Sequence, residues 1–329
     1  MYKFYLEPRN QNEATNFYIN IIKTAIESTG EKVIFTSSVK EIEKNDKVLV
    51  VSLKMFLFVW LNNPKQHIVT WYQGVAPEEA MCDSEHNILF KLTRKNLLNI
   101  LERLALKYSV KNIFVSNAML EHYKNKYKYQ SENHIIMPCF NQSLKRKYFT
   151  KEKYLTPSFV YAGSLSEWQC IDGTLAIYKK INRLYPNSSL TLLTKEKEKA
   201  KLICERSGIK ADIKYVPISD LEVELGKYKY GFIVRDNIIV NNVATPTKMN
   251  SYMSVGVIPI FSNVVYDFKT VFEKMKYVVP FMSDDECING INRLENSGIN
   301  VDDIINEYCC VFSSYYSVEK YVEILKESL

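Results

Sequence analysis

The sequence predicts an α/β protein made of two Rossmann-like domains, each with a parallel sheet, that face each other across a cleft. Short apolar runs rich in β-branched residues alternate with helical segments of about 10 to 15 residues, which is typical of βαβ units. The alternation stops at a basic stretch bounded by proline, residues 144–157, which is expected to be a linker, and then starts again. With 329 residues, the chain is long enough for two domains that each bury a core.

The first half begins with an expected strand at residues 4–6 and a helix at residues 16–29. Phe17, Ile21 and Ile22 are among the apolar residues that share one face of this helix. Further strands are expected at residues 33–36, 48–53, 68–72, 113–116 and 135–138, and further helices at residues 92–108 and 118–126.

The second half repeats this pattern. Strands are expected at residues 159–162, 189–193, 212–216, 230–234 and 257–261, and helices at residues 171–184, 195–207 and 317–327. Before the last of these strands, Thr245 is expected to cap a helix, Pro246 to stand in its first turn and Gly256 to end it.

Charge is unevenly distributed along the chain. Residues 1–150 contain 21 Lys and Arg against 14 Asp and Glu, whereas the remainder contains 22 against 23. We therefore expect only the first domain to meet an anionic surface.

The composition indicates a cytoplasmic protein. No apolar run approaches the roughly 20 residues of a membrane span. The first residues do not have the layout of a signal peptide, and the seven cysteines lack the CxxC spacing of a zinc ribbon. The four histidines and the carboxylates form no metal-binding motif, so no metal is expected.

The stretch around Lys248 predicts an anion site. The apolar run 230–234 stops at Arg235 and Asp236, two charges that cannot stay unpaired inside a strand. Lys248 falls in the first turn of the next expected helix, where free N–H groups already favour an anion. The alternative is that Arg235 and Asp236 form a surface ion pair and that Lys248 is an ordinary solvated residue.

This stretch also resembles a known signature. The string PTKMNSYMSVG, preceded by VRD, is similar to the nucleotide-sugar motif P-x-K-x-x-E-Y-x-A-x-G of retaining GT-B glycosyltransferases. The resemblance is to the group-1, family 4-like enzymes of capsule, lipopolysaccharide and exopolysaccharide biosynthesis. It extends to the strings TWYQGVAPEE, VSNAM and YAGSLSEWQ.

The resemblance implies a domain plan and an activity. Residues 1–150 would bind the acceptor, residues 151–312 the nucleotide sugar, and the helix in residues 313–329 would cross back to the first domain. The activity would be transfer of a sugar from a nucleoside diphosphate sugar to a bacterial surface glycan or lipid-linked glycan. It would proceed with retention and without a metal or other cofactor, in the cytoplasm at the inner face of the plasma membrane.

The resemblance and the spacing together assign site residues. Arg235 and Lys248 would stabilise the leaving diphosphate, Gln73 would orient a hydroxyl, and Glu78 and Glu79 would lie on the acceptor side. The residues expected to bind the donor are Gly163, Ser164, Leu165, Thr194, Pro217, Ile218, Asp236, Pro246, Thr247, Ser251 and Tyr252.

Three departures from the family pattern leave an alternative open. Ser164 and Gln169 stand where relatives have cations, and Ser251 stands where they have a glutamate that holds the ribose. The chain would then be a non-catalytic GT-B-like partner or scaffold subunit of a glycosyltransferase complex. An epimerase built on the same two domains is a further alternative.

The helix at residues 92–108 combines apolar residues with Lys91, Arg94, Lys95, Arg103 and Lys107. Such a helix is typical of contact with an anionic membrane, although a core helix with a solvated face has the same pattern. Nucleic-acid binding is not expected, because the basic residues form no helix or repeat with interleaved aromatics.

Overall fold

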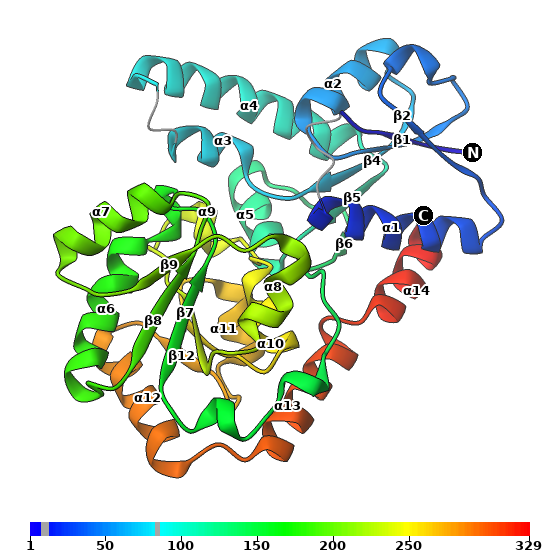
Figure 1. Cartoon of the computed structure of the whole chain (residues 1–329). Helices are drawn as coiled ribbons and strands as arrows, with labels where there is room; N and C mark the ends of the chain where they lie inside the picture. The colour runs from blue at the N-terminus through cyan, green and yellow to red at the C-terminus, as the bar shows by residue number, and fades with distance from the viewer. Residues whose placement is uncertain (8–12, 83–85) are drawn as a thin grey trace. The chain divides into compact units, whose positions relative to one another are not determined.

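The computed structural model describes residues 1–7, 13–82 and 86–329. They form two compact units (Figure 1). The first unit consists of Met1–Asn141 and Ser317–Leu329, and the second of Gln142–Tyr316. The stretch expected to be a linker, residues 144–157, belongs to the second unit, where it carries the short 3-10 helices η4 (Arg146–Tyr148) and η5 (Glu152–Tyr154).

The first unit is built on a sheet of six parallel strands in the order β2-β1-β3-β4-β5-β6. Its strands are β1 (Tyr2–Tyr5), β2 (Val33–Thr36), β3 (Lys47–Val50), β4 (His67–Tyr72), β5 (Lys111–Phe114) and β6 (His134–Ile136). Its helices are α1 (Glu13–Ser28), α2 (Leu53–Asn62), α3 (Ala76–Glu79), α4 (Ile88–Tyr108), α5 (Asn117–Tyr127) and α14 (Val318–Ser328), with the 3-10 helices η2 (Val39–Glu41) and η3 (Ala80–Cys82).

The last helix of the chain completes the first unit. Figure 1 shows α14 (red) beside α1 (blue). The Tyr321 ring of α14 is buried 5.7 Å from the Phe140 ring, measured between centroids. The Tyr2 hydroxyl of β1 donates to the Leu329 carbonyl at 2.9 Å. The core of this unit therefore depends on residues that follow the whole of the second unit in sequence.

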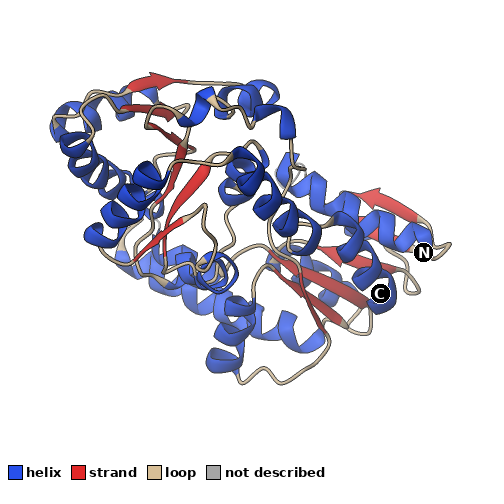
Figure 2. Cartoon of the chain, turned by 90° about the horizontal axis from the view of Figure 1, so that it is seen from below, coloured by secondary structure: helices blue, strands red, loops and turns tan. Residues whose placement is uncertain are grey.

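The second unit has another sheet of six parallel strands, in the order β12-β11-β10-β7-β8-β9. Its strands are β7 (Ser158–Ala162), β8 (Ser189–Leu193), β9 (Asp212–Lys214), β10 (Tyr230–Ile233), β11 (Ile258–Ser262) and β12 (Val279–Phe281). Its helices are α6 (Ile171–Leu184), α7 (Lys197–Ser207), α8 (Ile218–Leu225), α9 (Ile239–Asn242), α10 (Lys248–Ser254), α11 (Tyr266–Phe272), α12 (Asp284–Ser297) and α13 (Val301–Ser314), with the 3-10 helix η6 (Glu167–Gln169). In each unit the strands lie between helices (Figure 2).

The strand order of the second unit reverses at one position. From β7 the chain moves outward to β8 and β9, then returns to place β10 on the other side of β7. β7 and β10 are paired, with Tyr230 opposite Phe159. The loops after these two strands leave in opposite directions, and ligands of open α/β sheets bind at such a switch point.

The structure corrects the expected helix around Lys248. Thr245 does not cap it: α10 begins at Lys248, and its cap residue Thr247 makes no side-chain capping bond. Thr245 is buried instead, because the chain enters α10 through Pro246, whose carbonyl accepts from the Met249 N–H at 3.2 Å. With seven residues, α10 is shorter than expected, so any attraction for anions must come mainly from side-chain charge.

The other predicted helices and strands lie within a few residues of their expected bounds. The structure also contains elements that were not predicted, namely α3, α8, α9, α11, β12, α12 and α13. None of the helices in the described residues is both long and apolar enough to span a bilayer.

Candidate functional site

Gly163 directly follows β7, at the carboxyl end of that strand. Its φ angle of 145° lies in the region that favours glycine. A Cβ atom at this position would lie 2.8 Å from both Cε and Nζ of Lys248. Gly163 therefore leaves the space into which Lys248 extends.

Lys248 brings its ammonium group to this space from the start of α10. Nζ lies 4.2 Å from the centroid of the Tyr161 ring, in a cation–π contact. Nζ also donates to Oε1 of Gln169 at 2.6 Å. Burial, assisted by the charge of Arg235, lowers the pKa of Lys248 well below its ordinary value.

Arg235 reaches the same point from the loop after β10. Only 6% of its surface is exposed, and its backbone N–H donates to Oγ of Ser262 at 2.9 Å. The guanidinium donates to Oε1 of Gln169 at 2.7 Å and to the Gln169 carbonyl at 3.2 Å. It also donates to the Val234 carbonyl at 3.0 Å. Burial lowers the pKa of Arg235 from its usual value, yet a guanidinium stays charged at neutral pH.

Arg235 and Lys248 thus place two positive charges on one neutral amide oxygen. Among the described residues, no carboxylate lies within ion-pair distance of either cation. Arg235 does not form the surface ion pair considered above, because Asp236 is exposed and accepts instead from Sγ of Cys170 at 3.3 Å. Buried charge without a counterion is unfavourable, so this arrangement favours an anionic ligand.

The turn after β7 is fixed by contacts of its backbone. The N–H of Leu165 donates to the Glu196 carboxylate at 2.6 Å, and the Leu165 carbonyl accepts from Nζ of Lys199 at 2.9 Å. The Tyr161 hydroxyl donates to the Ser164 carbonyl. Ser164 and Leu165 are therefore held in place beside Gly163, as the sequence placed them.

Three other predicted donor-binding residues follow neighbouring strands. Thr194 is buried directly after β8, and its N–H donates to the Lys214 carbonyl at 3.0 Å. Pro217 caps α8 after β9, and Ile218 is exposed at the start of that helix. They lie at the carboxyl ends of β8 and β9.

The predicted residues of α10 divide into accessible and buried positions. Pro246, Thr247 and Ser251 are half-buried, and Ser251 lies one turn after Lys248 on the same helical face. Tyr252 is buried, its hydroxyl accepts from the Ala162 N–H at 3.1 Å, and its ring fills the space beside Gly231. Tyr252 thus fixes α10 against β7 and β10.

Sequence reasoning assigned no role to Tyr161, Gln169 or Glu196. For Tyr161 a signal existed, because residues two apart on a strand point to the same side, which places Tyr161 beside Gly163. No such signal exists for Gln169 and Glu196, since their contacts with Arg235 and Leu165 join segments distant in the chain.

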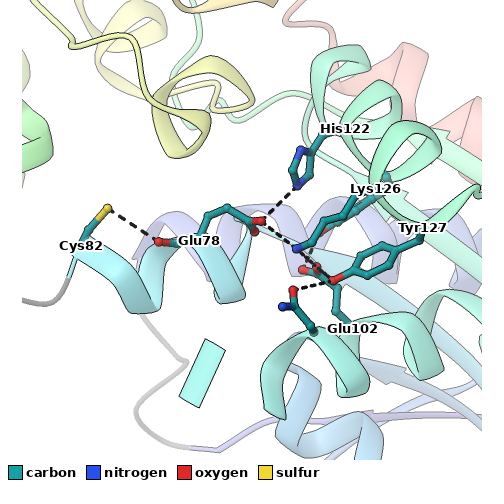
Figure 3. Close-up of polar contacts among 8 residues, drawn as sticks. Glu78, Cys82, Glu102, His122, Lys126 and Tyr127 are labelled. Carbon is teal, nitrogen blue, oxygen red and sulfur yellow. Dashed lines mark hydrogen bonds and ion pairs between the residues drawn. The ribbon is translucent and has the colours of Figure 1, made fainter. Parts of the chain in front are cut away.

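In the first unit, Glu78 of α3 lies in a buried polar cluster (Figure 3). Its Oε1 accepts from Nζ of Lys126 at 2.7 Å and lies 3.6 Å from Nε2 of His122. Burial opposes ionisation of Glu78, but the neighbouring His122 and the hydrogen bond from Lys126 outweigh it and lower its pKa to about 2. A carboxylate this weakly basic is suited to anchoring α3 against α5 rather than to accepting a proton.

Glu102 of α4 completes this cluster. Its carboxylate accepts from the hydroxyls of Tyr123 at 3.0 Å and Tyr127 at 2.8 Å, and from Nζ of Lys126 at 3.2 Å. Figure 3 shows Lys126 reaching from Glu78 to Glu102. Burial raises the pKa of Glu102, while Lys126 opposes that shift. One lysine therefore links carboxylates from α3 and α4 to α5.

Glu79 differs from its neighbour. Glu79 is exposed overall, but its carboxyl group folds back on Gly74. A Cβ atom added to Gly74 would lie 1.9 Å from Oε1 of Glu79. Burial of this carboxyl group raises the pKa of Glu79, partly offset by a hydrogen bond from the Val75 backbone. Gln73 is exposed at the end of β4. Of the predicted acceptor-side residues, Gln73 and Glu79 are thus those outside the ion-paired cluster.

No protein-family model matches the sequence, and no curated protein matches it. Solved structures do match the fold. Anabaena HepE in complex with UDP has a TM-score of 0.68 at 10% identity, covering 99% of this chain and 98% of HepE. WaaG, a glycosyltransferase involved in lipopolysaccharide biosynthesis, has a TM-score of 0.65 at 12% identity, covering 99% of each chain.

A mutant of S. aureus TarM in complex with Fondaparinux, α-GlcNAc-glycerol and UDP has a TM-score of 0.61 at 11% identity. That match covers 85% of this chain and 55% of TarM, so the chain spans about half the length of this relative. With two parallel six-stranded units and these structural neighbours, the chain has the GT-B fold of glycosyltransferases.

Proposed function

We propose that this protein is a glycosyltransferase that takes a sugar from a nucleoside diphosphate sugar. The observation that carries the proposal is the pair of cations, Arg235 and Lys248, that meet on a neutral oxygen at the switch point of the second unit. Binding of UDP by HepE and TarM supports a nucleoside diphosphate as the ligand.

The reaction that these residues serve is departure of the diphosphate from the anomeric carbon of the sugar. Negative charge gathers on the leaving phosphate in the transition state, and fixed cations that await it lower the barrier. Arg235 and Lys248 supply this charge without a metal, and Gly163 leaves the space through which Lys248 reaches this position. We assign retention of configuration on family resemblance.

Nucleotide-dependent stabilisation tests the donor site. Thermal unfolding is measured with UDP, GDP, CDP, dTDP and ADP for the wild type and for Lys248→Ala. We expect one nucleotide to raise the unfolding temperature, because a ligand of the folded state stabilises it, and Lys248→Ala to weaken binding by about tenfold or more. Lys274→Ala, which removes an exposed lysine of the same unit, should bind as the wild type does. Absence of stabilisation by every nucleotide contradicts the proposal.

The acceptor is assigned to the first unit, as a bacterial surface glycan or a lipid-linked glycan. Gln73 and Glu79 are its proposed contacts, because Glu78 is held in an ion pair with Lys126. Incubation of the donor sugar with candidate acceptors, followed by mass spectrometry, tests transfer. Gln73→Ala should reduce transfer to the acceptor while leaving nucleotide binding unchanged.

Peripheral contact with an anionic membrane, at its inner face in the cytoplasm, is the second part of the proposal. Its support is α4, where Leu89, Leu97 and Ile100 are 73%, 57% and 59% exposed. Arg94 and Arg103 are exposed on the same helix. Apolar side chains that insert between lipids, with cations beside them, are typical of interfacial helices.

Vesicle co-sedimentation tests this surface. The wild type should pellet with vesicles that contain phosphatidylglycerol and remain in solution with phosphatidylcholine vesicles. Leu97→Asp and Ile100→Asp should abolish pelleting, whereas Leu202→Asp, at a 66% exposed leucine of α7, should not. Equal pelleting of all three variants would assign binding to another surface.

A second candidate function is a non-catalytic GT-B-like partner of a glycosyltransferase complex. Ser251 favours it, since one hydroxyl cannot hold both ribose hydroxyls as a carboxylate does. This alternative predicts no turnover with any donor and acceptor, and unchanged complex assembly in Lys248→Ala.

A further inference from the structure

Gln169 occupies the position at which an anion would contact both cations of the second unit. Its Oε1 lies 2.6 Å from Nζ of Lys248 and 2.7 Å from Nη2 of Arg235. Both partners are donors without acceptor capacity, so the oxygen and not the amide nitrogen must face them. A phosphate oxygen that accepts from the same N–H groups of both cations has to take the place of this atom.

A neutral amide is a weaker partner for two cations than a phosphate. Charge-assisted hydrogen bonds to an anion are shorter and stronger than those to an amide oxygen. The amide oxygen nevertheless accepts one hydrogen bond from each of Arg235 and Lys248. The side chain therefore gives each cation a neutral acceptor without forming an ion pair.

The surroundings allow Gln169 to leave. Gln169 is half-buried at the end of η6, a single turn whose residues Glu167 and Trp168 are exposed. The backbone nearer β7 is fixed separately, through the bonds of Leu165 to Glu196 and Lys199. Rotation of one side chain is thus enough to remove the amide oxygen from both cations, while Arg235 keeps its hydrogen bonds to the backbone carbonyls of Gln169 and Val234.

We propose that Gln169 is an internal ligand of the diphosphate position, displaced when a nucleoside diphosphate or another polyphosphate binds. This inference rests on the proposed function and adds that the Gln169 side chain competes with the ligand for the two cations. The apparent affinity of the site is then lowered by the fraction of molecules in which Gln169 occupies it. Removal of the amide raises the affinity, and replacement of the amide by a carboxylate closes the site.

The test is calorimetric titration of the purified full chain with inorganic pyrophosphate and with UDP. We expect Gln169→Ala to bind both about tenfold more tightly than the wild type, if the amide occupies the site in about nine of ten molecules. Gln169→Glu should bind neither, because its carboxylate neutralises Arg235 and Lys248. Glu167→Gln, at an exposed residue of the same turn, should match the wild type.

The outcomes separate this inference from the proposed function. Unchanged or weaker binding by Gln169→Ala overturns the inference, because the amide would then assist the ligand, and leaves the proposed phosphate site intact. Binding by Gln169→Ala but not by the wild type supports the inference. Failure of both to bind pyrophosphate and UDP overturns the inference and the proposed site together. Gln169→Asn, whose shorter side chain cannot reach both cations, repeats the test if the alanine variant does not fold.

Discussion

At the scale of single residues, burial of Lys248 disfavours the positive charge that its proposed function requires. Its ammonium group lies over the Tyr161 ring and next to Arg235, and its pKa is lowered because burial disfavours the charged form. An anion bound beside it has the reverse effect and raises the pKa. Binding of the ligand and of a proton to Lys248 are therefore coupled.

Nucleotide affinity should fall as pH rises above the lowered pKa of Lys248. In that range the free protein loses the proton and the complex must regain it. The groups that face Lys248 do not titrate there: Arg235 stays charged, burial raises the pKa of Tyr161, and Gln169 is neutral. Calorimetry with UDP from about pH 7 to about pH 10, above the titration of phosphate, measures this slope.

Lys248→Arg is the matched variant, since a guanidinium keeps its charge over the whole range. Its affinity should be independent of pH. The stability of the free wild type has the opposite slope: the unfolded chain binds the extra proton of Lys248, so the free energy of unfolding rises with pH in the same window. A pH-independent affinity in the wild type would contradict this coupling between ligand binding and protonation of Lys248.

At the scale of elements, the buried cluster of Glu78, Lys126 and Glu102 holds three helices of the first unit together. Glu78→Gln should lower the free energy of unfolding by about 1–3 kcal/mol, because it leaves Lys126 with one carboxylate fewer in a buried position. Urea unfolding followed by tryptophan fluorescence measures the change. In a Trp168→Phe background, Trp60 and Trp71 report on this unit alone.

The control for Glu78→Gln is Glu121→Gln on α5. Glu121 pairs with Lys124 at 2.8 Å, but both side chains are exposed, so its loss should change stability by less than about 0.5 kcal/mol. The effect of Glu78→Gln should also disappear in acid. The pKa of Glu78 is lowered to about 2, so its contribution is present above pH 4 to 5 and is lost as pH falls towards 2. Equal effects of both variants would contradict a special role for the cluster.

Most strands and several of the longer helices could be predicted from the sequence, but the short helices could not. The helix at residues 171–184 and the strand at residues 189–193 are confirmed to the residue, because apolar spacing and flanking turns agree there. The α9 and α10 helices have four and seven residues, too few for a periodic pattern, and cap signals at Thr245 gave the wrong start. α12 and α13 were not foreseen at all.

The candidate site was predictable in part, because some of its residues lie at the ends of strands or at the start of a helix. Gly163, Arg235 and Lys248 follow strands or begin a helix, and parallel strands bring such positions together at one edge. Gln169 was noted only as a missing cation, since its acceptor role depends on contacts with Lys248 across 79 residues. Tertiary contacts of this kind leave no local pattern.

At the scale of the molecule, the first unit is discontinuous in sequence, so its stability depends on the C-terminal helix α14. Tyr321→Ala should destabilise this unit by about 3 kcal/mol, because a buried ring that contacts Phe140 is lost. Glu323→Ala, at an exposed residue of the same helix, is the control. Differential scanning calorimetry should show a lower transition for the first unit only, and an equal shift of both transitions would mean that the units unfold together.

The position of α14 also has a consequence for synthesis on the ribosome. Residues 142–316 are translated before Ser317–Leu329, so the second unit can bury its core while the first still lacks a helix. Until α14 emerges, the apolar surface of α1 that it covers stays open to chaperones and to aggregation. A chain that stalls before Ser317 would leave the ribosome with its later half folded and its earlier half incomplete.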